Sequence, residues 1–146
     1  MKSTLRSCLV LSSLVILTAS CKKNSNSSNS NNTSGAVSIK YEMVCSAPIQ
    51  AAPAGLYNYV TYTNSDANGT EERNVINSTN WSKTITLNVT QRPIGIGFSG
   101  QTYTGSSGTI TSRIYINNEL KDEYSSDIFN SGSIFQGFWS NTYILY

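Results

Sequence analysis

Cys21 is the residue with the clearest chemistry in this sequence. It follows residues 14–20 (LVILTAS), and the chain before them is basic through Lys2 and Arg6. A basic start, a short apolar run and small residues before a cut make a secretory signal. A cysteine at the cut is typical of a bacterial lipoprotein signal, in which a diacylglycerol thioether forms on the cysteine and cleavage precedes it. Thr18 departs from this pattern, which usually has leucine three residues before the cysteine. We therefore predict lipidation of Cys21.

Residues 1–20 are thus expected to be a signal peptide that the mature chain lacks. The apolar run from Leu9 to Leu17 contains two serines and is much shorter than the roughly 20 apolar residues of a spanning helix. A retained N-terminal membrane helix is the alternative. The expected location is a bacterial membrane, where the lipid on Cys21 holds the protein in the outer membrane, facing the periplasm or the cell surface.

The charge of the remaining chain argues against nucleic acid as a partner. Residues 36–146 contain 6 basic and 8 acidic side chains, because the other four basic residues lie in the signal or beside Cys21. A net charge of −2 leaves no basic patch for phosphate groups.

Side chains for catalysis are scarce. The sequence has no histidine, which removes the usual general base and the commonest zinc ligand. Ser82 and Lys83 are adjacent, so on a strand they point to opposite faces. The carboxylate pairs at 71–72 and 122–123 split in the same way. Residues 66–71 share part of a calcium-loop pattern but lack the later bidentate glutamate, and a turn is the better interpretation. We expect no enzyme activity, no metal and no cofactor.

Aromatic side chains are the best candidates for a binding surface, because the sequence has nine Tyr, two Trp and four Phe. Exposed Tyr and Trp side chains stack on sugar rings or anchor protein interfaces. The candidate binding surface comprises Tyr57, Tyr59, Tyr115 and Trp139. Cross-strand packing on the outer face of a sheet is the structural alternative. Cys45, the remaining thiol, is expected to be a small buried apolar residue.

The elements that position these residues are predicted from composition and periodicity. Residues 21–35 combine Cys21 with an Asn/Ser-rich stretch, which predicts a flexible tether. Residues 36–146 are expected to form one domain. Apolar residues alternate in 37–45, 85–89, 94–98 and 110–116, while 57–63 and 133–146 suit strands by composition. The last strand is expected to bend or bulge near Gly137.

Turn residues separate these strands. Asn117-Asn118 and residues 66–69 have hairpin-turn chemistry. The segment 120–128 has apolar residues at helical spacing, but the asparagine turn before it favours a second hairpin strand. Seven or eight short antiparallel strands in about 110 residues are typical of an immunoglobulin-like β-sandwich. The residues expected in its core are Trp81, Ile85, Leu87, Ile110, Ile114 and Ile116, with a hydrogen-bonded hydroxyl at Ser112.

Short motifs also resemble a known family. Residues 81–87 (WSKTITL) and 108–117 (GTITSRIYIN) look like core motifs of the MmpS family, as do residues 60–64 with the Asp/Asn/Gly loop after them. The resemblance covers about residues 36–130. It implies a small membrane-anchored, extracytoplasmic, immunoglobulin-like β domain that assists lipid or siderophore exporters without catalysis. Family members commonly have a cysteine where this chain has Ser112 and another near the C-terminus, so a family-type disulfide is not expected here. The lipid anchor also replaces their transmembrane helix.

These observations together predict a non-catalytic lipoprotein that acts as an interaction module. The first hypothesis is an accessory partner of a cell-envelope or transport complex, with an envelope protein and the membrane as partners. The alternative is a glycan-binding module that uses exposed aromatics. Exposed aromatics gathered in a groove would favour the glycan-binding function. A flat apolar sheet face or an unprotected edge strand would favour binding of a protein partner.

Overall fold

The computed structural model describes residues 35–65, 71–90 and 92–146, with the side chains of Glu71 and Glu72 excepted. Cys21, the predicted signal peptide, the tether up to residue 34 and the turn predicted at 66–69 lie outside the described residues. Predictions about them therefore stay predictions. None of the described residues forms a helix long and apolar enough to cross a membrane.

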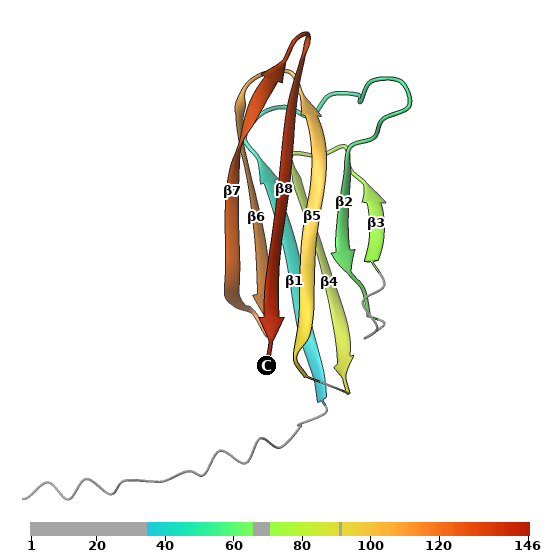
Figure 1. Cartoon of the computed structure of the whole chain (residues 1–146), viewed down its shortest axis with the longest axis vertical. Helices are drawn as coiled ribbons and strands as arrows, with labels where there is room; N and C mark the ends of the chain where they lie inside the picture. Colours follow the sequence, from blue (N-terminus) through green and yellow to red (C-terminus); the bar gives the residue numbers. More distant parts are fainter. Residues whose placement is uncertain (1–34, 66–70, 91) are drawn as a thin grey trace, which may run out of the picture. The chain divides into compact units, whose positions relative to one another are not determined.

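Eight antiparallel strands make up the described fold (Figure 1). They are β1 (Gly35–Cys45), β2 (Tyr59–Thr63), β3 (Glu71–Val75), β4 (Asn80–Val89), β5 (Ile94–Thr104), β6 (Gly108–Ile116), β7 (Glu119–Ser131) and β8 (Ile134–Leu145). Their order in the sheet is β3-β2-β5-β8-β7-β6-β1-β4. The predicted all-β class and the number of antiparallel strands are confirmed.

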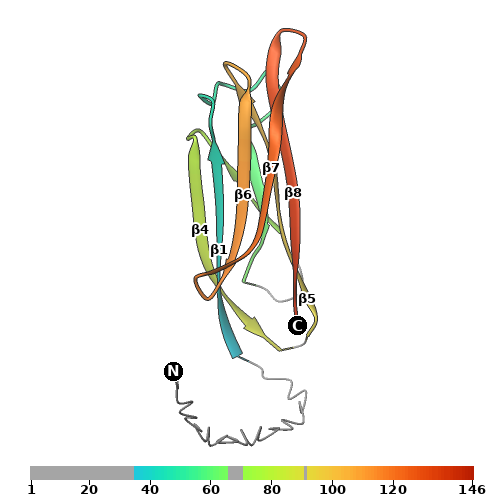
Figure 2. The same ribbon diagram turned by 90° about the vertical axis from the view of Figure 1, so that its left-hand side faces the viewer.

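The strands form one open, strongly curled sheet, seen from the side in Figure 2. The element that joins its two halves is β7. Residues 119–128 of β7 pair with β6, whereas Phe129, Asn130 and Ser131 pair with β8. Because a single strand passes from one half to the other, the expected division into two separate sheets is not clear.

The core lies inside the curl, and period-two alternation decides which side chains fill it. In β1 every second residue is buried, and the fully buried Tyr41 packs against Tyr62 and Phe98, with ring centroids 5.2 and 5.4 Å apart. Four of the six predicted core residues are buried, namely Leu87, Ile110, Ile114 and Ile116. The other two, Trp81 and Ile85, are only half-buried. Both belong to β4, an end strand of the sheet, which has a neighbour on one side only.

Two polar expectations for the interior are confirmed. Ser112 is fully buried, and its hydroxyl donates to Asn141 Oδ1 at 3.1 Å. Cys45 is buried and its Sγ donates to the carbonyl of Ala47 at 3.2 Å. Burial raises the pKa of the Cys45 thiol, and we therefore expect it to react slowly with thiol reagents until the protein unfolds.

The asparagine turn also forms as predicted. Asn117 and Asn118 have φ values of 51° and 67°, the left-handed values of a two-residue hairpin turn. The segment that follows is β7, so the prediction of a second hairpin strand is confirmed. The helical spacing of apolar residues in 120–128 does not correspond to a helix. In contrast, the structure has no bulge near Gly137, since pairing of β5 with β8 runs through this residue without a register shift. A Cβ at Gly137 would lie 2.2 Å from Ile110 Cδ1, so glycine permits close packing there.

Candidate functional site

One row of side chains crosses five neighbouring strands on the outer face of the curled sheet. Tyr59 of β2 is paired with Val75 of β3 on one side and with Gln101 of β5 on the other. Gln101 is paired in turn with Phe138 of β8. The ring of Phe138 stacks on Phe129 of β7, with centroids 5.9 Å apart. Register partners point to the same face, so these five residues form a line of roughly 19 Å at about 4.8 Å per strand. We call this line the aromatic row.

The apolar members of the aromatic row are unusually open to solvent. Val75, Phe129 and Phe138 expose 71%, 47% and 44% of their surface. Their sequence neighbours explain this, because the adjacent Ile76, Ile128 and Trp139 are buried inside the curl. Contiguous exposed apolar side chains are typical of an interaction surface.

Polar contacts hold the row in place. The Arg73 guanidinium lies over the ring of Tyr59, 4.3 Å from its centroid. The side-chain amides of Gln101 and Gln136 both donate to the hydroxyl of Tyr103, at 2.7 and 3.1 Å. Because these side chains are already bound to one another, little of their side-chain entropy would be lost if another molecule covered them.

The four aromatics predicted as a surface do not come together. Tyr57 is 63% exposed and precedes Tyr59, which belongs to the aromatic row. Tyr115 lies on β6, where its ring faces Lys40 Nζ at 5.0 Å and its hydroxyl donates to Glu42 at 3.3 Å. The expected exposure of Trp139 is wrong, since only 3% of it is accessible.

The burial of Trp139 has a specific cause. Gly100 lies opposite it in β5, and a Cβ at Gly100 would lie 2.3 Å from the indole. The missing side chain therefore makes room for the indole inside the curl. Adjacent Phe138 takes the outer position, and both Phe138 and Phe129 were missed as site candidates. Phe138 and Trp139 are adjacent aromatics on one strand, and either of them could face the core. The sequence alone therefore does not indicate which of the two is exposed.

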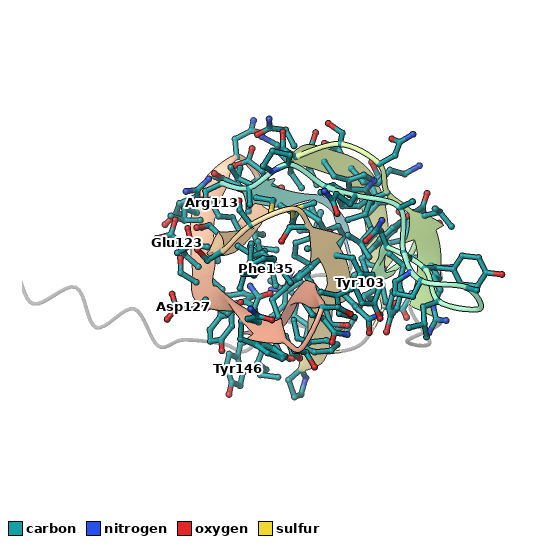
Figure 3. The ribbon with its side chains drawn as sticks, turned by 90° about the horizontal axis from the view of Figure 1, so that it is seen from above. Tyr103, Arg113, Glu123, Asp127, Phe135 and Tyr146 are labelled. Atoms are coloured by element: carbon teal, nitrogen blue, oxygen red, sulfur yellow. The ribbon has the colours of Figure 1, made fainter. Side chains whose placement is uncertain are left out.

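A second outer surface, on β1, β6 and β7, is a charge network. Glu42 accepts from Lys40 Nζ at 2.8 Å and from Arg113 Nη1 at 2.9 Å, and Arg113 Nε donates to Glu123 at 2.5 Å. The hydrogen bond from Lys40 lowers the pKa of the Glu42 carboxyl, against the effect of burial, and Arg113 adds to the lowering. Viewed from above, Arg113 and Glu123 lie outside the curl and Phe135 lies inside it (Figure 3). These charges satisfy each other, which suits a structural role.

The open strand edges carry features that oppose strand addition. Lys83 of β4 pairs with buried Tyr41, so a charge occupies the inner face of an end strand. Asp122 of β7 pairs with buried Ile114 in the same manner, next to a register irregularity. Inward charges, irregularities and short strands such as β3 are the usual protection of sheet edges. The exposed rings of Phe129 and Phe138 lie on strands away from the two ends of the sheet, β3 and β4.

Catalytic groups are not assembled in the part of the chain that the structure describes. No group of three or more Cys, Asp or Glu side chains there is arranged to hold a metal ion. Ser82 pairs with Glu42 on the outer face while Lys83 occupies the inner one, so these two side chains are separated as expected. A hollow beside Glu42 is lined by Asn80 and Ser82, and the Glu42 carboxylate accepts there from Lys40 and Arg113.

Comparison with known proteins adds no relative. No protein-family model matches the chain, and no curated protein matches it.

Proposed function

We propose that this protein is a lipid-anchored, non-catalytic interaction module that binds a protein partner through the aromatic row. The observation that carries the proposal is the line of exposed apolar side chains across β3, β2, β5, β8 and β7. Burying Phe129, Phe138 and Val75 against a partner would contribute about 25 cal/mol for each Å² removed from water. A small central group of aromatics commonly dominates the affinity of an interface.

The position of the row supports a role in presenting a surface. Gly35, where β1 begins, lies at the lower end of the domain, whereas the start of β2 and the end of β3 lie in its upper half (Figure 1). If Cys21 is lipidated, residues 22–34 form a tether of at most about 45 Å. The β2 and β3 end of the aromatic row then lies away from the end of the domain at which β1 begins.

The shape of the site favours protein over glycan. The row lies on a sheet face, and its two most exposed rings, Phe129 and Phe138, stack on each other and lack a polar group. Sugar-binding platforms combine a free ring face with hydrogen-bonding groups, for which Tyr57 is the better candidate. Glycan binding is therefore the second candidate function.

The wider role and the finer fold belong to the same proposal. An accessory role in an envelope or transport complex rests on the predicted anchor and on the resemblance to the MmpS family. An immunoglobulin-like sandwich would place β3-β2-β5-β8 against β4-β1-β6-β7. The short β7–β8 pairing and the contact of Ser112 in β6 with Asn141 in β8 support that arrangement.

Site-specific photocrosslinking in the native membrane tests the proposal. A photoreactive phenylalanine replaces Phe138, and the matched control replaces Ile144, which is also exposed on the outer face of β8. We expect a discrete protein adduct from position 138 and none from 144. Equal adducts at both positions, or none, would contradict the proposal. A glycan array that binds the protein in a Tyr57-dependent way, without adducts at 138, would support the second candidate.

A further inference from the structure

The β7 end of the aromatic row has a second property, which is uncompensated negative charge. Strand β7 carries four carboxylates and one lysine, whereas β8 beside it and β5 on the far side of β8 carry no charged residue. Glu119 pairs with Lys121 and Glu123 pairs with Arg113. Asp122 and Asp127 make no ion pair with any residue that the structure describes.

Asp127 lies directly beside the exposed rings. It is paired with Thr109, and Phe129 follows two residues later on the same face of β7. Two residues along a strand are about 6.8 Å apart, so the carboxylate and the Phe129–Phe138 stack are open to one ligand group. Asp127 lies on the outside of the curl (Figure 3).

A carboxylate next to an aromatic face is suited to a cation. The ring face attracts a guanidinium or ammonium group through its quadrupole, and the carboxylate pairs with the same group by charge-assisted hydrogen bonds. An anionic or neutral ligand would leave Asp127 without a partner in the interface. Arginine fits best, because its planar group stacks on a ring while its edge bonds a carboxylate.

Tyr124 and Asp122 do not extend this chemistry along β7. Tyr124 pairs with buried Ser112 and Asp122 pairs with buried Ile114, so both have inward parity, opposite to that of Asp127 and Phe129. Asp127 is therefore the carboxylate of β7 that shares the outer face with the aromatic row and makes no ion pair with a described residue.

We propose that the partner presents a cationic, arginine-bearing segment that docks at the β7 end of the aromatic row, with one arginine side chain on Asp127 and Phe129 and the rest of its contact on the aromatic row. This inference rests on the proposed function and specifies the chemistry of the partner. Complementary charge at the rim raises the association rate and makes binding sensitive to salt, while the apolar row supplies most of the affinity.

Peptide binding to the full-length lipoprotein in detergent tests the inference. The probe is a labelled nine-residue peptide of alternating arginine and threonine, and its control replaces each arginine with glutamate. Fluorescence anisotropy is recorded at low and high salt. We expect the arginine peptide alone to bind, more weakly at high salt. Asp127→Asn and Phe129→Ala should each weaken binding about fivefold, equivalent to roughly 1 kcal/mol.

Glu119→Gln is the matched control, because it removes the same charge from β7 at a residue already paired with Lys121. Its effect should stay below about twofold. Equal losses for Asp127→Asn and Glu119→Gln would overturn the inference, since they would indicate attraction to net charge alone. Failure of the arginine peptide while position 138 still crosslinks to a protein would refute the cationic partner and leave the proposed function standing. Failure of both would remove both proposals.

Discussion

At the scale of single residues, the buried polar groups couple stability to pH. The Tyr41 hydroxyl donates to the carbonyl of Thr63 at 2.8 Å within the core. Desolvation raises the pKa of Tyr41 well above its ordinary value. The folded state therefore holds this proton more tightly than the unfolded chain does. The buried, protonated Tyr41 hydroxyl adds to the free energy of unfolding. This contribution is complete below about pH 10, the ordinary tyrosine pKa, and is lost as pH rises above it.

Tyr41→Phe should expose this coupling. We expect a loss of about 1 kcal/mol in unfolding free energy at pH 7, the usual net value of one hydrogen bond. The difference from the parent protein should shrink above pH 10, where ionisation of Tyr41 favours the unfolded parent chain. Urea denaturation at pH 7, 9 and 11 measures it, and the raised pKa of Cys45 acts equally on both proteins. A difference independent of pH would contradict the assignment.

At the scale of elements, β4 is the strand whose protection is easiest to remove. Its outward side chains are uncharged Ser, Thr and Asn, and Lys83 is the one charge in the strand. Lys83 lies opposite Tyr41, so an added strand would have to cover an ammonium group. Lys83 therefore protects the open edge of β4 against pairing with another strand. The sequence suggested this residue only as a weak partner for Ser82.

Lys83→Val should therefore promote self-association through β4. Valine suits the inner face of a strand and leaves an uncharged edge of ten residues. We expect concentration-dependent dimers or larger species in light scattering, with little change in the fold by circular dichroism. Thr84→Val is the control, because it adds the same side chain on the outer face and keeps Lys83. A monodisperse Lys83→Val protein would show that the edge is protected by another feature.

At the scale of the whole molecule, the proposed function gives the anchor and the domain separate tasks. The described domain, residues 35–65, 71–90 and 92–146, would present the proposed binding surface, and the predicted lipid would confine that surface to a membrane. Stable membrane attachment needs more than one acyl chain, which a lipoprotein modification supplies. Such attachment would raise the effective concentration of the domain near a partner in the same membrane, so that a small interface would be enough for binding.

Lipidation of Cys21 is directly testable in a Gram-negative host. Labelled palmitate should enter the parent protein, and Cys21→Ala should release the protein into the soluble fraction without label. Cys45→Ala serves as the control, because this thiol is buried in the domain and should not affect labelling. Unlabelled, soluble parent protein would eliminate the anchor.

The sequence by itself determined the all-β class, the alternation of β1 and β6 and the asparagine hairpin. Each of these depends on residues close together in the chain, where the period of two and left-handed asparagines act locally. Motifs could also show that Ser82 and Lys83, or Asp122 and Glu123, lie on opposite faces. The aromatic row could not be predicted in this way, since Tyr59 and Phe138 are far apart in sequence.

Only the tertiary structure decided which of two adjacent aromatics faces outwards. Gly100 in β5 leaves room for the indole of Trp139, and this places Phe138 in line with Gln101 and Tyr59. Strand β7 changes its pairing partner from β6 to β8, and this change joins the strands into one curled sheet rather than two clearly separate sheets. The position of the change also depends on the tertiary structure. Strand pairing joins residues distant in the chain, so its register follows from packing of the whole core and not from any local pattern.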